Sequence, residues 1–124
     1  MEFDLKADGS GYRGLVVWQR AMELCVAVYA LTDQMSESEK FGLISQLQRA
    51  GVSVPSNIAE GYGRGAGKDY VKHLRYAMGS LAEVETQIEI AVRCNRLNRD
   101  DVKDAWQLAQ ETGKLLTRLI QSRT

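Results

Sequence analysis

The sequence of 124 residues contains one histidine, one proline and two cysteines, and it has no long hydrophobic run. Its longest apolar run, LCVAVYAL from Leu24 to Leu31, is far shorter than the roughly 20 residues that span a bilayer. A single histidine, His73, cannot supply the two histidine ligands of an HExxH or a paired Glu-x-x-His metal site. We therefore expect no transmembrane helix, no metal site and no cofactor.

The chain also lacks an excess of charge and an export signal. Sixteen Lys and Arg residues balance sixteen Asp and Glu residues, which argues against a whole surface that binds nucleic acid but leaves a local basic patch open. The first residues, MEFDLKADGSGYRG, carry acids where a signal peptide has positive charge, so we expect a cytoplasmic protein. Cys25 and Cys94 lie far apart in apolar neighbourhoods, which predicts two buried, reduced thiols.

Helical periodicity, in contrast, runs along nearly the whole chain. Four segments place apolar residues at alternating steps of three and four, with no alternating strand pattern between them. This predicts an all-α fold, an antiparallel up-and-down four-helix bundle over residues 14–124, preceded by a flexible N-terminal arm over residues 1–13. The four rows are Val17, Ala21, Leu24, Val28, Leu31 and Met35; Ile44, Leu47, Gly51, Val54 and Ile58; Tyr70, Leu74, Ala77, Leu81, Val84, Ile88 and Ala91; and Val102, Trp106, Ala109, Gly113, Leu116 and Ile120.

Capping patterns mark where helices begin. Ser36 followed by Glu39 predicts a capping box at the start of the second helix. Asn98 followed by Asp101 predicts the start of the fourth helix, and the third should cover about residues 67–95.

The first helix has a second apolar row beside its core row, which makes it apolar around nearly its whole circumference. Because the interior of one bundle covers only one broad side of a helix, the other side is predicted to meet another subunit. The second row comprises Trp18, Met22, Cys25 and Tyr29.

The glycine-rich stretch SVPSNIAEGYGRGAGKDY, residues 53–70, resembles a phosphate-binding loop only superficially. A Walker loop requires glycine where Tyr62 stands and Ser or Thr where Asp69 stands. The partial match to GxGxxA follows a helical segment rather than a strand, and GVSVP has Pro55 where a nucleophile elbow has glycine. The glycines are therefore predicted to turn the chain between two helices, and Pro55 to kink its helix without breaking it.

A polar stripe follows the second helix at steps of three and four. It is either the solvated side of an amphipathic helix or a buried hydrogen-bond network that fixes helix or subunit register. A small-ligand site converging on Ser53, Asn57 and Glu60 is a further alternative. The members of the stripe are Gln46, Arg49, Ser53, Asn57 and Glu60.

Basic residues gather around the start of the third helix. They form either a solvated face or a site for RNA or phosphate, and no recognisable RNA-binding motif accompanies them. These residues are Arg64, Lys68, Lys72 and Arg75.

Three segments carry a family resemblance: LVVWQRAMELCVAVYALT, FGLISQLQRAGVSVPSNIAEGYGR with its NIAEG core, and YVKHLRYAMGSLAEVETQIEIA. Over residues 12–120 the chain resembles the bacterial four-helix-bundle family named after the protein encoded within intervening sequences of the large ribosomal RNA. The resemblance implies a ring-shaped homo-oligomer, typically a homopentamer, without known enzymatic activity. A related accessory factor of diversity-generating retroelements is thought to bring a reverse transcriptase and its RNA together through a basic surface.

These observations together predict a non-enzymatic, oligomeric interaction or scaffold module. RNA binding through Arg64, Lys68, Lys72 and Arg75 is the first alternative, and ligand binding at the stripe of the second helix is the next.

Overall fold

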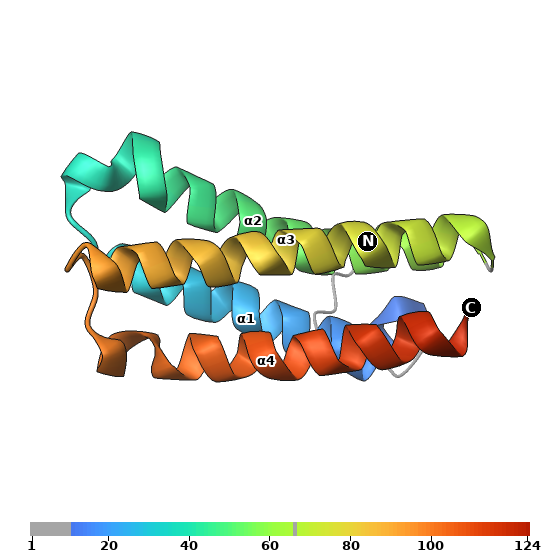
Figure 1. Cartoon of the computed structure of the whole chain (residues 1–124). Coiled ribbons are helices and arrows are strands. Elements are labelled where there is room, and N and C mark those ends of the chain that lie inside the picture. Colours follow the sequence, from blue (N-terminus) through green and yellow to red (C-terminus); the bar gives the residue numbers. More distant parts are fainter. Residues whose placement is uncertain (1–10, 66) are drawn as a thin grey trace, which may run out of the picture.

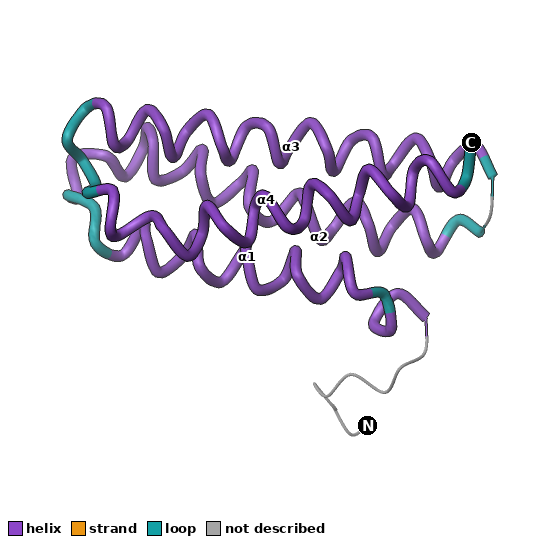
Figure 2. Tube along the Cα trace, turned by 60° about the horizontal axis from the view of Figure 1, so that its bottom comes forward, coloured by secondary structure: helices purple, strands orange, loops and turns teal. Residues whose placement is uncertain are grey.

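The protein is all-helical in the computed structural model, which describes residues 11–65 and 67–124 and contains no strand within them. The described chain forms four long helices, α1 to α4, and Figure 1 shows them lying side by side. In Figures 1 and 2 the α1–α2 and α3–α4 connections lie at one end, and the α2–α3 connection lies at the other. The predicted all-α class is thus confirmed. The helices are α1 (Val16–Asp33), α2 (Ser45–Gly63), α3 (Lys68–Arg93) and α4 (Arg99–Ser122).

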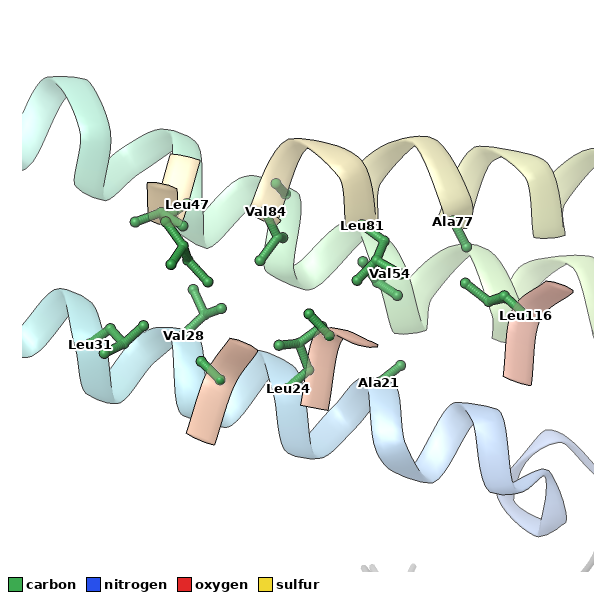
Figure 3. Packing of buried hydrophobic residues seen from close by; sticks show 14 of the residues in the cluster. Ala21, Leu24, Val28, Leu31, Leu47, Val54, Ala77, Leu81, Val84 and Leu116 are labelled. Carbon is green, nitrogen blue, oxygen red and sulfur yellow. The ribbon is translucent and has the colours of Figure 1, made fainter. Parts of the chain in front are cut away.

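One hydrophobic core runs between the four helices. Figure 3 shows side chains such as Leu24, Val54, Leu81 and Leu116 converging from α1, α2, α3 and α4 respectively. The rows predicted for α1 and α3 are buried throughout. Burial of one aliphatic or aromatic side chain contributes about 1.5–3 kcal/mol, so this shared core is the main source of stability.

The row predicted for α4 is wrong at Trp106, which is 37% exposed. The neighbouring positions Ala105 and Thr112 face the core instead. Thr112 can be buried there because its Oγ1 donates to the carbonyl oxygen of Leu108 at 2.7 Å, which satisfies the hydroxyl within the helix. The α4 surface directed to the core therefore combines small residues such as Ala105 and Thr112 with the larger Leu116 and Ile120.

The capping box predicted at Ser36 and Glu39 is also wrong. Ser36 caps a short 3₁₀ helix, Glu37–Glu39, by accepting from the backbone N–H of Ser38, and a π-helical segment, Lys40–Ile44, precedes α2. The Glu39 carboxylate instead contacts the guanidinium of Arg96 at 2.9 Å. This ion pair joins the α1–α2 connection to the α3–α4 connection, so the glutamate is not free to cap its own helix.

The capping box predicted at Asn98 and Asp101 is confirmed. Between α2 and α3 the chain turns at Gly65 and Gly67, whose φ values of +88° and +101° favour glycine. Helix α2 continues through Pro55, so the proline does not break it.

At the N-terminal end, the predicted arm over residues 1–13 falls mainly outside the described residues. Its last part belongs to a 3₁₀ helix, Gly11–Gly14, in which the Tyr12 ring packs edge-on against Trp18 with centroids 5.1 Å apart. No helix in the described part of the chain combines the length and the apolar character that crossing a membrane requires.

The two cysteines differ in exposure. Both are free thiols, and Cys25 is half-buried while Cys94 is exposed, so the prediction of two buried thiols is wrong for Cys94. Cys94 directly follows the last residue of α3, where the chain leaves the core.

Candidate functional site

A chain of hydrogen bonds, the α2–α3 polar network, joins Ser53, Asn57, His73 and Ser80. The two serine hydroxyl oxygens lie 2.7 Å apart. The Asn57 amide nitrogen donates to the backbone oxygen and the hydroxyl of Ser53, each at 2.9 Å, and its Oδ1 lies 3.2 Å from His73 Nδ1. These half-buried groups satisfy one another between two helices, as buried polar groups must.

Gly61 brings the two helices together beside this network. A Cβ atom at this position would lie 2.7 Å from His73 Cβ and 3.3 Å from the backbone oxygen of Tyr70. The glycine of the NIAEG segment therefore permits close helix packing and does not contribute to the turn, contrary to its predicted role.

The predicted stripe is divided by this arrangement. Ser53 and Asn57 lie in the network, while Gln46, Arg49 and Glu60 are exposed. Glu60 contacts Arg64 at 3.1 Å and reaches within 4.0 Å of His73 Nδ1. The alternatives of solvated face and hydrogen-bond network thus apply to different members of one stripe.

The partners of the stripe on α3 were not predicted from the sequence. Gln46 accepts from Gln87 at 3.4 Å, so the pairs Gln46–Gln87, Ser53–Ser80 and Glu60–His73 form successive rungs. Each step of seven residues along α2 is matched by a step of seven back along α3. The repeat of His73, Ser80 and Gln87 was the signal that could have identified them.

The predicted basic residues do not act as one group. The Arg64 guanidinium contacts Glu60, whereas Lys68, Lys72 and Arg75 line a shallow hollow together with Arg123 from the end of α4. None of these last four side chains has a carboxylate within 4.0 Å in the described part of the chain. We call Lys68, Lys72, Arg75 and Arg123 the basic cluster. Arg123 is far away in sequence, so only the fold reveals it.

The outer side of α1 carries exposed apolar residues. Val26 is 67% exposed, and Met22 and Tyr29 are about two-fifths exposed. Tyr29 also lines a hollow between α1 and α2 that includes Val52. We call Met22, Val26 and Tyr29 the α1 ridge. Of the predicted second apolar row of α1, Met22 and Tyr29 are thus exposed, whereas Trp18 and Cys25 are half-buried.

A groove of about 700 Å³ lies between α3 and α4. Its apolar lining includes Val92 and the indole of Trp106. The ionisable residues that line this α3–α4 groove are Glu89, Arg93, Arg99 and Lys103. Glu89 and Arg93 contact each other at 2.7 Å and so neutralise each other. The remaining charges at the edge of the groove are the cations of α4, Arg99 and Lys103.

These features define an all-helical domain with one core, one polar seam and several exposed surfaces. The family model of the 23S rRNA-intervening sequence protein matches residues 13–118, and the chain belongs to this family, as the resemblance implied. No curated protein matches the chain.

A solved structure confirms the fold. It is the 1.70 Å crystal structure of a protein of unknown function from the S23 ribosomal protein family of Bacteroides thetaiotaomicron VPI-5482. The two chains are 25% identical, the alignment covers 86% of this chain and 96% of the other, and the TM-score is 0.79.

Proposed function

We propose that the helices form an antiparallel, up-and-down bundle that assembles as a homo-oligomer and acts as a non-enzymatic interaction or scaffold module. A ring of five subunits is the state that the family resemblance implies. The exposed α1 ridge carries this proposal. Exposed Val26, beside Met22 and Tyr29, forms an apolar surface that a second chain can cover.

The position of α1 explains why this surface needs a partner. Helix α1 packs against α2 on one side and α4 on the other, and Val17, Leu24 and Val28 face the core. The α1 ridge lies on the side of α1 that faces away from the core, outside the contacts with α2 and α4. Removing such side chains from water contributes about 25 cal/mol per Å² of apolar surface, which favours assembly.

The mass of the particle in solution tests the proposal. Light scattering at micromolar protein should return a multiple of the 13.8 kDa chain mass, and a homopentamer should return five times that mass. The mass of a single chain would contradict the proposed assembly.

Binding of RNA through the basic cluster is the second candidate function. Lys68, Lys72, Arg75 and Arg123 offer four cations around one hollow, and a ring would repeat them on every subunit. Phosphate contacts of this kind are insensitive to base sequence, and their affinity falls by one to several orders of magnitude between about 50 and 200 mM salt.

An RNA titration in low salt tests this second candidate. The triple variant Lys68→Ala, Lys72→Ala and Arg75→Ala should bind more weakly than the wild type without unfolding, because all three residues are exposed. A control of equal charge change combines Lys40→Ala, Lys114→Ala and Arg118→Ala, which are exposed elsewhere. Equal loss of affinity in both variants would argue against a site at the basic cluster.

The small-ligand alternative has less support. The polar atoms of Ser53 and Asn57 are engaged with each other, with Ser80 and with His73. A ligand would have to replace these bonds, so the network favours a structural role for the stripe.

A further inference from the structure

We propose that the α1 ridge of one subunit docks into the α3–α4 groove of the next copy, so that subunits associate head to tail. This inference rests on the proposed assembly and names the two surfaces that form its interface. A closed ring requires a heterologous contact, in which each subunit offers two different surfaces. The chain has two such surfaces that do not overlap.

The two surfaces lie on different sides of the domain. The α1 ridge borders α2, because Tyr29 and Val52 line the same hollow. The groove lies between the other two helices and is lined from α3 and α4. One subunit can therefore use its ridge and its groove at the same time, with different neighbours.

The two surfaces match in chemistry. The ridge presents Met22, Val26 and Tyr29, and the groove is lined by Val92, Val102 and Trp106. Both surfaces leave apolar area exposed in the isolated chain. Their contact would bury an aromatic side chain from each partner, and buried aromatic residues commonly dominate the binding energy of an interface.

Charge is complementary at one end of the contact. Asp33, the exposed last residue of α1, continues the ridge four residues after Tyr29. The corresponding end of the groove carries Arg99 and Lys103. Asp33 has no cation within 4.0 Å in the described part of its own chain. Such a pair at the rim favours one orientation of docking more than it adds affinity.

The two surfaces also lie at nearly the same height along the helices. The ion pair between Arg20 and Glu111, 2.9 Å long, fixes the register of α1 against α4. Counted in opposite directions from this pair, Val26 is six residues from Arg20 and Trp106 is five from Glu111, while Asp33 is 13 and Arg99 is 12 residues away. At about 1.5 Å per residue, each pair differs in height by about 1.5 Å. A ring axis parallel to the helices keeps contacting residues at equal height, so ridge and groove would meet with an axial shift of only about one residue.

Two matched substitutions test the inference by native mass measurement. Val26→Lys impairs the ridge and leaves the groove, and Trp106→Lys impairs the groove and leaves the ridge. Each variant alone should lose the oligomer at a concentration where the wild type is fully assembled. An equimolar mixture should give particles of two chains, because only one intact ridge and one intact groove can meet. Ile90→Lys, a 44% exposed apolar residue outside both surfaces, should assemble as the wild type does.

The outcomes separate this inference from the proposed assembly. A monomeric wild type would overturn both. If the wild type is oligomeric and Trp106→Lys keeps the wild-type mass, only the head-to-tail contact is overturned. In particular, dissociation of Val26→Lys together with an assembled Trp106→Lys would indicate that the ridge of one subunit meets the ridge of another. Circular dichroism verifies that each variant is folded.

A second measurement does not depend on impairing the groove. In a Trp18→Phe background, Trp106 is the remaining tryptophan, and its exposed indole should be quenched by acrylamide in dilute, dissociated protein. Assembly should shift its emission to shorter wavelength and reduce quenching severalfold. Identical quenching in dissociated and assembled protein would contradict docking at the groove.

Discussion

Helix α3 is packed in two contrasting ways against its two neighbours. Towards α2 it contacts its partner along most of its length, and the contact combines core residues with the α2–α3 polar network. Towards α4 the contact is less extensive, and a groove remains that is lined by Val92 and Trp106. Helix α3 therefore has a closely packed contact with α2, called here the tight seam, and a less extensive contact with α4, called here the open seam.

Glycines show the same contrast at atomic scale. At Gly61 a Cβ atom would lie 2.7 Å from the Cβ of His73, an atom close to the backbone that cannot move alone. At Gly113 in α4 a Cβ atom would lie 3.3 Å from Leu81 Cδ2, the end of a side chain beside a surface hollow. The difference teaches that the α2–α3 contact specifies the fold of the single chain, whereas the α3–α4 contact leaves surface for a partner.

The largest effect is expected from Gly61→Ala. The added methyl group must displace His73 or separate the helices, which should lower the free energy of unfolding by about 1–3 kcal/mol. Urea denaturation at fixed protein concentration measures this change.

Gly79→Ala is the matched control for Gly61→Ala, because a Cβ atom at Gly79 meets nothing within 4 Å. This variant should be more stable by up to about 1 kcal/mol, since alanine favours the helix. If Gly61→Ala and Gly79→Ala both raise the free energy of unfolding, the contact between α2 and α3 has room for the added methyl group, contrary to its geometry.

Asn57→Leu should give the next largest effect. Leucine removes the partner of His73 Nδ1 and one of the two partners of the Ser53 hydroxyl, which keeps Ser80, and this should cost about 1–2 kcal/mol. Glu60→Leu, one turn further along the stripe, changes a side chain that is 53% exposed and should alter stability by less than about 0.5 kcal/mol. Thermal melting of both variants checks the comparison, and equal losses would mean that the stripe acts as one unit.

A smaller effect of opposite sign is expected from Gly113→Ala on the open side of α3. Leu81 can turn toward the neighbouring hollow, so the gain in helix propensity should exceed the cost of the contact and raise stability by about 0.5 kcal/mol. The same urea experiment measures it. A loss as large as that of Gly61→Ala would show that both seams are equally tight.

Helix positions could be predicted because the core rows of α1 and α3 consist of strongly apolar residues at regular steps. The α4 row failed because Ala105 and Thr112 are only weakly apolar, so the sequence could not distinguish their row from that of Trp106. Hydropathy alone does not separate a small core residue from a small surface residue.

The candidate sites were predictable only in part. The stripe on α2 was visible from its spacing, but its partner His73 depends on which helix packs beside it. Arg123 joins Lys68 only after the chain has folded, since the two residues lie at opposite ends of the α3–α4 pair in sequence. Which residues share one face of a helix can be predicted from their spacing in the sequence. Which residues of two different helices lie side by side depends on how those helices pack.

The smallest effect at neutral pH is expected from Tyr70→Phe within the tight seam. The Tyr70 ring is buried with the Arg123 guanidinium 4.9 Å from its centroid, and its hydroxyl has no hydrogen-bond partner in the described part of the chain. Phenylalanine preserves the ring and removes the unpaired hydroxyl, so stability at pH 7 should be unchanged or higher by less than about 0.5 kcal/mol.

A difference should emerge at alkaline pH. Burial raises the pKa of the Tyr70 hydroxyl, and the positive charge of Arg123 opposes this only in part. An unfolded chain ionises its tyrosines near pH 10, whereas folded Tyr70 holds its proton more tightly, so the wild type should lose stability as the pH rises above about 10. Tyr70→Phe lacks this loss, and its melting temperature relative to wild type should rise over that range. Parallel curves for the two proteins up to pH 11 would indicate that the Tyr70 hydroxyl contacts water, and that the tight seam is open at this end.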